Sequence, residues 1–241
     1  MRNFEYKKDL AINYQHVDYT GIMKLSHLLD ELANVATSHA MLLEVWSKEL
    51  LEDYGWIVSK MHLEINEPLS TGNYELLTYP GIASKVIFPR YYQILKDDQV
   101  IMKASSIWTL LDLKRRRITM PQRVGIDFPN ITEVKEEIKI AQEINQDIPY
   151  VLKEERIVRY SDVDTNQHMN NARYLEWACD LMDYTVFKNQ FVHIIDIFFK
   201  HEIAPNETVK LYMYQDKDIY YFKGMVNEID CFEIRLVMKN K

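Results

Sequence analysis

The sequence predicts an α+β protein built from two tandem copies of one unit, each a long helix packed against an antiparallel β-sheet. Three observations lead to this fold class. Residues 12–36 and 158–182 align without gaps at an offset of 146 positions. Apolar residues recur at helical spacing in both segments, and strand-like segments follow each of them. One helix layer on one sheet layer is the α+β arrangement.

The identities between the two segments cluster around a turn that leads into a helix. They pair Tyr14 with Tyr160, Val17 with Val163, Asp18 with Asp164, Met23 with Met169 and Leu29 with Leu175. Apolar positions further along also correspond. Self-similarity of this kind indicates two copies of one supersecondary unit.

Each copy continues into an amphipathic helix. In the first copy the apolar face consists of Leu25, Leu28, Leu29, Leu32 and Ala36. In the second it consists of Leu175, Ala178, Cys179, Met182 and Val186. Spacings of three and four residues place these side chains on one side of a helix, which predicts a buried face.

Strand-like segments rich in Val, Ile, Tyr, Phe and Thr follow each helix. They cover residues 55–65, 73–80, 86–95 and 100–113 in the first copy, and 191–203, 208–214, 219–226 and 231–238 in the second. Turn signals such as DD and STGN separate them. Because the connections are short, we expect antiparallel pairing. Each half is therefore predicted to be a strand, a helix and about four strands.

A polar segment without a strand pattern separates the copies. We therefore divide the chain into an N-terminal unit of residues 1–122, a linker of residues 123–150 and a C-terminal unit of residues 151–241. Within the linker we expect residues 133–144 to be partly helical.

The composition excludes several classes of protein. The 241 residues are 47% hydrophobic and 27% charged, and the net charge of −7 argues against broad nucleic-acid binding. No apolar run approaches the roughly 20 residues of a membrane helix, and the start of the chain lacks a signal-peptide core, so we expect a cytoplasmic protein. Two cysteines and six glycines form neither a metal pattern nor a phosphate loop, so we expect no metal and no cofactor.

A cluster of short polar side chains precedes the second helix. Asn170 and Asn171 have a simple explanation as helix caps, because amide side chains bond the free N–H groups of a first turn. Asp164, Asn166 and His168 alternate, so in extended backbone they face one side. The first copy has Asp18, Thr20 and Ile22 at these positions. A turn that only needed capping would not require the imidazole and the amide.

The residue types of the second copy suit the transfer of an acyl group to water. A helix N-terminus offers free N–H groups and a partial positive charge to a developing oxyanion. A carboxylate, an amide and an imidazole lie directly before it. Asp18, which lacks these partners, is predicted to be structural.

The run SDVDTNQHMNNARYLEW resembles the acyl-acyl-carrier-protein thioesterase family of plants and bacteria, whose signature is D-x-N-x-H-x-N-N-x-x-Y. The segments NYQHVDYTGIMKLSHLLDE, GWIVSKMHLEINEP and SSIWTLLDLKRRRI are similar to the N-terminal half of that family. The resemblance implies a tandem double hotdog fold, in which each sheet wraps round a long helix. It also implies hydrolysis of fatty acyl-acyl carrier protein (acyl-ACP), which releases a free fatty acid and the carrier.

The same resemblance implies the site residues. Asp164, Asn166 and His168 match catalytic positions, and Glu202 in FFKHEI matches a strand glutamate of the family. The family's neighbouring cysteine is replaced by Ile203, so a cysteine nucleophile is not expected there. Cys179 and Cys231 are expected in the core.

We therefore expect direct attack by water. Glu202, or alternatively Asp164, would act as the general base. His168 would donate a hydrogen bond toward the thioester carbonyl or be oriented by Asp164, and Asn166 would hold the water or the thioester. Backbone N–H groups near Asn170 and Asn171 would stabilise the oxyanion.

The family places the acyl chain in the N-terminal half, where Trp56 and Met61 would suit an apolar tunnel or be ordinary core. Acyl carrier protein is acidic, so docking requires a local basic patch. The densest positive run is Lys114, Arg115, Arg116 and Arg117, with Lys85, Arg90 and Arg123 as additions. A plain surface turn is the other interpretation of this run. A homodimer is compatible with the sequence.

Three other functions compete with this hypothesis. An acyl-coenzyme A thioesterase would share the chemistry but bind a phosphate-bearing handle. A hotdog hydratase or dehydratase also uses an Asp–His pair, but its usual spacing differs from NQHMNN. A non-catalytic acyl-thioester sensor would bind without turnover, and such sensors usually carry a DNA-binding segment. No basic helix-turn-helix pattern precedes Tyr14, which argues against this function.

Overall fold

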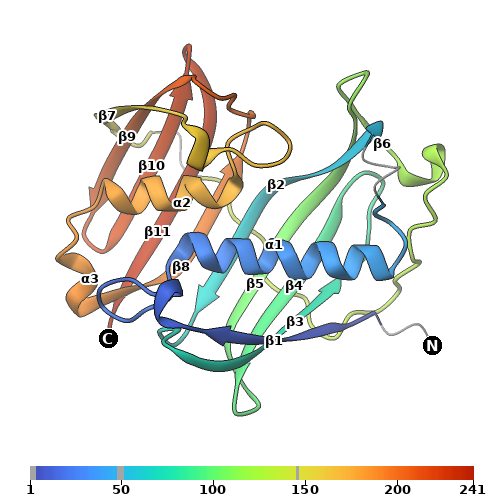
Figure 1. The fold of residues 1–241 in the computed structure, drawn as a ribbon, viewed down its shortest axis with the longest axis horizontal. Helices are drawn as coiled ribbons and strands as arrows, with labels where there is room; N and C mark the ends of the chain where they lie inside the picture. Colours follow the sequence, from blue (N-terminus) through green and yellow to red (C-terminus); the bar gives the residue numbers. More distant parts are fainter. Residues whose placement is uncertain (1–3, 48–51, 145–146) are drawn as a thin grey trace.

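One antiparallel sheet runs through the computed structural model, and both long helices lie on the same face of it (Figure 1). The structure describes residues 4–47, 52–144 and 147–241. The strands are β1 (Tyr6–Ile12), β2 (Tyr54–Ile65), β3 (Gly72–Pro80), β4 (Phe88–Lys96), β5 (Gln99–Asp112), β6 (Arg117–Thr119), β7 (Val151–Ile157), β8 (Gln190–Phe199), β9 (Thr208–Asp216), β10 (Ile219–Val226) and β11 (Ile229–Asn240). The α-helices are α1 (Leu25–Leu42), α2 (Asn171–Asp180) and α3 (Val186–Asn189), and the 3-10 turns are η1 (Tyr14–His16), η3 (Pro121–Val124) and η4 (Tyr160–Asp162).

The two halves of the sheet are built in the same order and meet at equivalent strands. From its outer edge inward, the N-terminal half runs β1, β3, β4, β5, β2, and the C-terminal half runs β7, β9, β10, β11, β8. Strand β2 pairs antiparallel with β8, so that Met61 lies opposite Ile197 and His62 opposite Asp196. Each half is a strand, a helix and four strands, as the sequence predicts, and the short β6 extends the first half.

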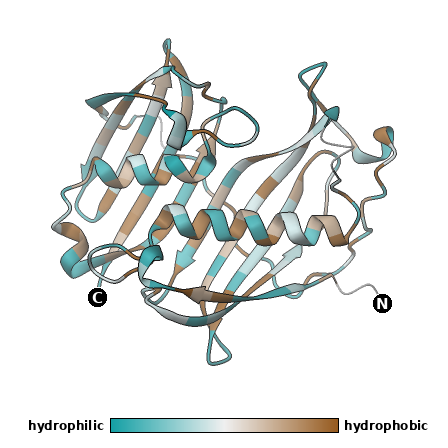
Figure 2. Cartoon of the chain, in the orientation of Figure 1, coloured by the Kyte–Doolittle hydropathy of each residue, from teal (hydrophilic) through white to brown (hydrophobic). Residues whose placement is uncertain are grey.

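Helix α1 covers the N-terminal half of the sheet. It contains neither glycine nor proline, and Leu28, Leu29, Leu32 and Val35 are almost completely buried against the strands. Figure 2 shows hydrophobic and hydrophilic residues alternating along this helix. Burial of each such leucine contributes about 1.5–3 kcal/mol, so this face holds the helix on the sheet. No helix among the described residues is long and apolar enough to cross a membrane.

Helix α2 is shorter than the sequence predicts. The expected apolar face extends to Met182 and Val186, but α2 ends before both, and Val186 begins the separate helix α3. Oδ1 of Asp183 accepts hydrogen bonds from the backbone N–H and the hydroxyl of Thr185, at 2.9 and 2.8 Å. An aspartate that bonds the nearby backbone in this way competes with helical hydrogen bonds, so the chain turns here.

Residues 133–144 form no helix, so the prediction that this part of the linker is partly helical is wrong. These residues cross the face of the sheet opposite α1 as irregular chain. The hydroxyl of Tyr79 donates to the carbonyl of Glu136 at 3.0 Å, and that of Ser105 donates to the carbonyl of Lys139 at 2.6 Å. Side chains of the sheet thus bond carbonyl groups that a helix would use internally, which holds the linker against the strands.

A polar cluster is buried beneath the C-terminal end of α1. Arg90 is only 8% exposed, and its Nη1 lies 3.1 Å from Nδ1 of His39 and 3.2 Å from the hydroxyl of Thr78. Arg90 shares the inner face of β4 with Tyr92, because alternate residues of a strand point to the same side. The prediction that Arg90 adds to a basic surface patch is therefore wrong.

This cluster makes stability depend on pH. Burial, helped by the charge of Arg90, lowers the pKa of His39 from 6.5 to about 4. As pH falls from about 6.5 toward 4, the unfolded chain binds a proton at this residue and the folded chain does not. We therefore expect the free energy of unfolding to fall by up to about 3 kcal/mol across this window from His39 alone.

Urea unfolding at pH 7, 5.5 and 4.5 measures the effect, with His39→Gln as the comparison. The parent should lose more stability over this range than the variant, because glutamine does not titrate. Equal losses in the two proteins would contradict the assignment.

Candidate active site

Two loops of the same backbone conformation precede α1 and α2. In the first loop the N–H of Asp18 donates to the carbonyl of Ile22 at 2.7 Å. In the second the N–H of Asp164 donates to the carbonyl of His168 at 2.9 Å. These residues are paired by the sequence repeat, so the two copies fold alike at the level of individual hydrogen bonds.

The apex of each loop holds a residue in the left-handed region. Gly21 has φ of 81° and Gln167 has φ of 63°. Glycine adopts this conformation readily, whereas a side chain with a Cβ is disfavoured by roughly 1–2 kcal/mol. The second loop keeps the shape in spite of this cost, a pattern that is frequent at functional loops.

The carboxylate of Asp164 holds the second loop in shape. Its Oδ1 accepts the backbone N–H of Asn166 at 2.8 Å, and its Oδ2 lies 3.4 Å from the side-chain nitrogen of Asn166. In the first loop, Oδ1 of Asp18 accepts the N–H of Thr20 in the same manner at 2.7 Å. Because the first loop lacks the amide and the imidazole, this bond is a structural feature common to both copies.

The loops also bond to equivalent segments of the sheet. The methionine that ends each loop donates its N–H to the carbonyl of Leu69 in the first half, at 2.7 Å, and to that of Ile203 in the second, at 2.8 Å. The residue before the acceptor is Pro68 in the first half and Glu202 in the second. The first copy therefore has no counterpart of the Glu202 carboxylate.

The side chain of His168 in the second loop faces that of Glu202, which follows β8. Nε2 of His168 lies 3.6 Å from Oε2 of Glu202, and the two side chains are 35% and 37% exposed. Both groups are thus within reach of a substrate and of water. An imidazole and a carboxylate at this separation are suited to acid–base chemistry at a bound ligand.

Glu202 lies beyond the end of β8, so the prediction that it lies on a strand is wrong. Strand β8 ends at Phe199, and the N–H groups of Lys200 and His201 both donate to the carbonyl of Cys231, at 2.8 and 3.1 Å. Two consecutive donors on one acceptor break the strand ladder. The chain therefore leaves the sheet and carries Glu202 toward the loop.

The N-terminus of α2 is largely capped by its own residues. Oδ1 of Asn170 accepts the N–H of Ala172 at 2.8 Å, and the N–H of Asn170 donates to the carbonyl of Asp162 at 2.8 Å. Asn170 is thus the helix cap. In the part of the chain that the structure describes, no hydrogen bond occupies the N–H of Asn171. Of the backbone N–H groups of Asn170 and Asn171, that of Asn171 is therefore the one free to bind an anion.

Arg116 reaches the site from the N-terminal half. Its Nη2 donates to Oε2 of Glu202 at 2.9 Å, across 86 positions of the chain. The sequence predicts a docking role for Arg116 and carries no signal for this contact. The β5–β6 hairpin therefore contributes a cation to a site whose other residues come from the C-terminal half.

The rest of the basic run divides between paired and unpaired residues. Lys114 forms an ion pair with Asp53, and Nη1 of Arg115 lies 3.7 Å from Oδ2 of Asp112. Arg117 forms no ion pair in the described ranges of the chain. All four side chains remain exposed to solvent.

Comparison with known proteins identifies the chain. Residues 3–130 match the family model of the acyl-ACP thioesterase N-terminal domain, and residues 145–239 match that of the acyl-ACP thioesterase C-terminal domain. The chain belongs to the acyl-ACP thioesterase family.

Solved structures of this family share its fold. An acyl-ACP thioesterase from Bacteroides thetaiotaomicron superposes with a TM-score of 0.81 at 19% identity, covering 98% of this chain and 98% of that one. The 12:0-ACP thioesterase from Umbellularia californica superposes with a TM-score of 0.82 at 16% identity, covering 100% of this chain and 99% of that one. The chain is therefore a double hotdog, as the sequence predicts.

Curated relatives in the family are longer than this chain. The dodecanoyl-[acyl-carrier-protein] hydrolase of Cinnamomum camphora is 24% identical over 203 residues, which are 77% of this chain and 52% of that protein. The palmitoyl-acyl carrier protein thioesterase of Cuphea hookeriana is 19% identical over 227 residues, 85% of this chain and 53% of that protein. The chain spans about half the length of the curated relatives it matches.

Neither cysteine of this thioesterase-family chain is placed to act as a nucleophile. Burial, together with the charges of Asp180 and other acidic residues, raises the pKa of Cys179 to about 12. Burial also raises the pKa of Cys231. Thiols with raised pKa stay protonated at neutral pH, and only the thiolate is nucleophilic. The described residues contain no cluster of three or more His, Cys, Asp or Glu side chains that could hold a metal ion.

Tyr174, which closes the family signature, lies beneath the site. It is 3% exposed, and its ring packs edge-on against Phe232 at 4.6 Å and against Phe199 at 5.6 Å. Burial raises its pKa, and the negative charges of Asp164 and Glu202 act in the same direction. Tyr174 therefore stays a neutral phenol beneath the site, a position that no local pattern of the sequence indicates.

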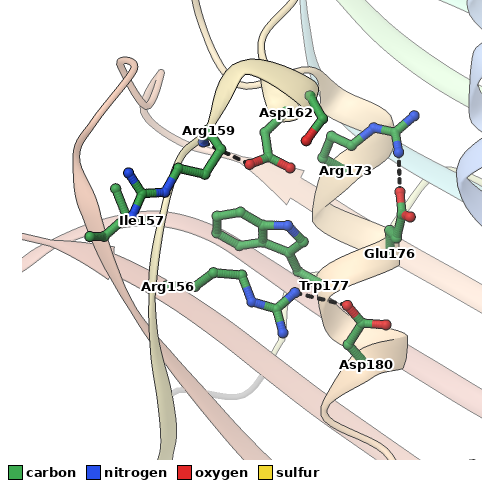
Figure 3. A pocket seen from close by; sticks show the side chains of 9 residues that line it. Arg156, Ile157, Arg159, Asp162, Arg173, Glu176, Trp177 and Asp180 are labelled. Atoms are coloured by element: carbon green, nitrogen blue, oxygen red, sulfur yellow. Dashed lines mark hydrogen bonds and ion pairs between the residues drawn. The ribbon is translucent and has the colours of Figure 1, made fainter.

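A pocket of about 360 Å³ lies between β7, the start of the second loop and α2 (Figure 3). Arg156 crosses it: Nη1 donates to Asp180 at 2.8 Å, the guanidinium binds both oxygens of Glu154 at 3.0 Å, and it lies over the ring of Trp177 at 5.1 Å. Because Arg156 is already fully engaged, we interpret its contacts as structural. They join α2 to β7 and so fix the helix whose N-terminus borders the site.

Replacing Arg156 with methionine should therefore affect stability more than catalysis. We expect the free energy of unfolding to fall by about 1–2 kcal/mol, because partly exposed ion pairs and a cation–π contact are lost together. Chemical unfolding measures this, and kcat should stay within about twofold because Arg156 touches no candidate catalytic residue. Lys210→Met removes an exposed ion pair with Glu228 and is the matched control. Equal losses in the two variants would contradict the structural role.

Proposed function

We propose that this chain hydrolyses the thioester of fatty acyl-ACP by direct attack of water in its C-terminal half. The observation that carries the proposal is the asymmetry between two loops of one conformation. The second loop bears Asn166 and His168 and faces Glu202, whereas the first bears Thr20 and Ile22 and faces Pro68. Family membership supports the class of substrate.

In the proposed reaction Glu202 accepts a proton from water as the water oxygen attacks the thioester carbonyl carbon. The tetrahedral oxyanion then collapses, the carbon–sulfur bond breaks, and the thiolate of the carrier's prosthetic arm leaves and is protonated. The fatty acid departs with the oxygen of water. A thiolate is a good leaving group, so a dedicated acid for it is not required.

The other polar residues act on the carbonyl and the loop. His168 donates a hydrogen bond toward the thioester oxygen, and the free N–H of Asn171 at the start of α2 adds a second donor. Asn166, in the second loop, orients the water or the thioester. Asp164 keeps the loop closed, because its carboxylate is already bonded to the backbone of Asn166, and so it is not the base we choose.

The N-terminal unit, residues 1–122, is proposed to receive the acyl chain. The apolar side chains that pack between α1 and its strands include Met61, and Trp56 packs against a second cluster that contains Leu43 and Val45. Residues 123–150 then act as the linker, and residues 151–241 as the catalytic unit. Charge reversal along the basic run, Lys114 to Arg117, should raise KM for acyl-ACP more than KM for the coenzyme A thioester.

One assay tests the proposal against its alternative, an acyl-coenzyme A thioesterase. One long-chain acyl group is offered on acyl carrier protein and on coenzyme A, and thiol release is followed for both. We expect kcat/KM to favour the carrier-linked substrate by at least tenfold, about 1.4 kcal/mol of additional transition-state binding. A preference for the coenzyme A thioester would make the alternative correct, and absence of turnover would remove the catalytic claim.

A further inference from the structure

The contact between Arg116 and Glu202 carries an inference about how the site is controlled, which rests on the proposed function. Arg116 lies in the turn between β5 and β6, with φ of 51°. Its Nη2 lies 2.9 Å from Oε2 of Glu202, whereas Nε2 of His168 lies 3.6 Å from that same oxygen. The hydrogen bond of Glu202 therefore goes to the arginine, and the imidazole is just outside bonding distance.

The oxygen that faces the histidine is thus occupied in the structure. A carboxylate that accepts one hydrogen bond keeps other lone pairs, so its use as a general base depends on whether one of them points at the water from which it takes a proton. Oε2 of Glu202 accepts a charged donor from the hairpin, and charge-assisted bonds of this kind are stronger than neutral ones. With Arg116 in place, Glu202 is held toward the hairpin rather than toward His168.

The ion pair between Arg116 and Glu202 is exposed enough for another carboxylate to replace Glu202. Arg116 is 65% exposed and Glu202 is 37% exposed, so solvent and salt screen their attraction. Lys114 pairs with the exposed Asp53, and the exposed Arg115 side chain lies 3.7 Å from the buried Asp112. A partner that brings its own carboxylates to the hairpin can therefore replace these intramolecular acceptors.

We propose that Arg116 is a positioning residue that couples docking of the acidic carrier protein to the release of Glu202. In the free protein Arg116 binds Glu202 Oε2. When the carrier protein docks on the hairpin, carboxylates of the carrier bind the guanidinium of Arg116 in place of Glu202. Glu202 is then free to turn toward His168 and the water. Coenzyme A carries a few phosphates and no broad acidic surface, so we expect its thioesters to reach the site with Arg116 still bound to Glu202.

Kinetics of Arg116→Met test the proposal, with one acyl group on acyl carrier protein and on coenzyme A. Methionine keeps the aliphatic stem and removes the donor. We expect kcat on the coenzyme A thioester to rise by about three- to tenfold with little change in KM, since the substitution frees Glu202 without docking. On acyl-ACP, KM should rise and kcat should stay the same. The ratio of kcat on acyl-ACP to kcat on the coenzyme A thioester therefore falls.

Two further variants separate this role from a general loss of positive charge. Arg117→Met removes a neighbouring charge that has no bond to Glu202, so it should raise KM for acyl-ACP without raising kcat on the coenzyme A thioester. Lys210→Met removes the exposed ion pair with Glu228. It should change neither KM for acyl-ACP nor kcat on the coenzyme A thioester. If Arg116→Met behaves like Arg117→Met, or lowers kcat on both substrates, the coupling is overturned.

The outcome distinguishes this inference from the proposed function. An unmodified chain that hydrolyses acyl-ACP, together with an Arg116→Met variant that leaves the kcat ratio unchanged, would overturn the coupling alone. An unmodified chain that hydrolyses neither substrate would overturn both.

Discussion

Glu202→Gln should lower kcat for acyl-ACP hydrolysis by about 10²- to 10⁴-fold, the usual contribution of a general base. Glutamine has nearly the same shape but cannot accept the proton of the attacking water. Glu202 lies outside the strand ladder and is partly exposed, so the substitution should leave the fold intact. KM should change much less than kcat, because the carboxylate acts in the transition state and contributes little to ground-state binding.

Steady-state thiol release measures the effect, and thermal unfolding verifies the fold. Glu228→Gln is the matched control, because Glu228 is an exposed glutamate whose carboxylate pairs with Lys210 and not with a candidate catalytic residue. The control should retain full activity. A loss of less than about threefold in Glu202→Gln would show that another group takes the proton, and Asp164→Asn would then be the next variant to measure.

The double variant Asn166→Thr, His168→Ile should lose at least about 10²-fold in kcat while folding normally. It gives the second loop the residues that the first loop carries at the same positions. Because Thr20 and Ile22 already support that backbone conformation, the substitution removes chemistry without a foreseeable structural cost. The expected loss is therefore assigned to the imidazole and the amide and not to a collapsed loop.

The reciprocal variant, Thr20→Asn with Ile22→His, is the control for this experiment. It should not create a second active site, because Pro68 stands where the carboxylate of Glu202 would be needed. Thiol release and circular dichroism on both variants complete the test. A double variant in the second loop that retained more than about half of the parental kcat would contradict the assignment of Asn166 and His168.

Local periodicity explains why most of the fold could be predicted from the sequence. Helix α1 buries one side and exposes the other, and strands β10 and β11 alternate buried and more exposed residues at a period of two. The repeat of residues 12–36 in 158–182 further predicted two copies, and the matching hydrogen bonds of Asp18 and Asp164 agree with that alignment.

The errors arose where side chains compete with regular backbone bonding. Asp183 bonds Thr185 and so ends the second helix earlier than its apolar spacing suggests. In the linker, hydroxyl groups of Tyr79 and Ser105 bond carbonyl oxygens and prevent a helix. These partners come from other elements, and periodicity along the chain carries no information about them.

The site was predictable in composition but not in geometry. The alternation of Asp164, Asn166 and His168, and the family signature around it, indicated which residues to examine. The bond between Arg116 and Glu202 joins positions 86 residues apart and depends on how the two halves pair through β2 and β8. No local pattern could reveal that one cation of the basic run points at the proposed base.

The most direct test of this account is thiol release from a long-chain acyl-ACP by the purified chain, with Glu202→Gln measured in the same assay. The account predicts that the parent releases thiol and free fatty acid in equal amounts over many turnovers, and that the variant is slower by at least about 10²-fold. No release by the parent, or equal rates from the two proteins, would contradict it.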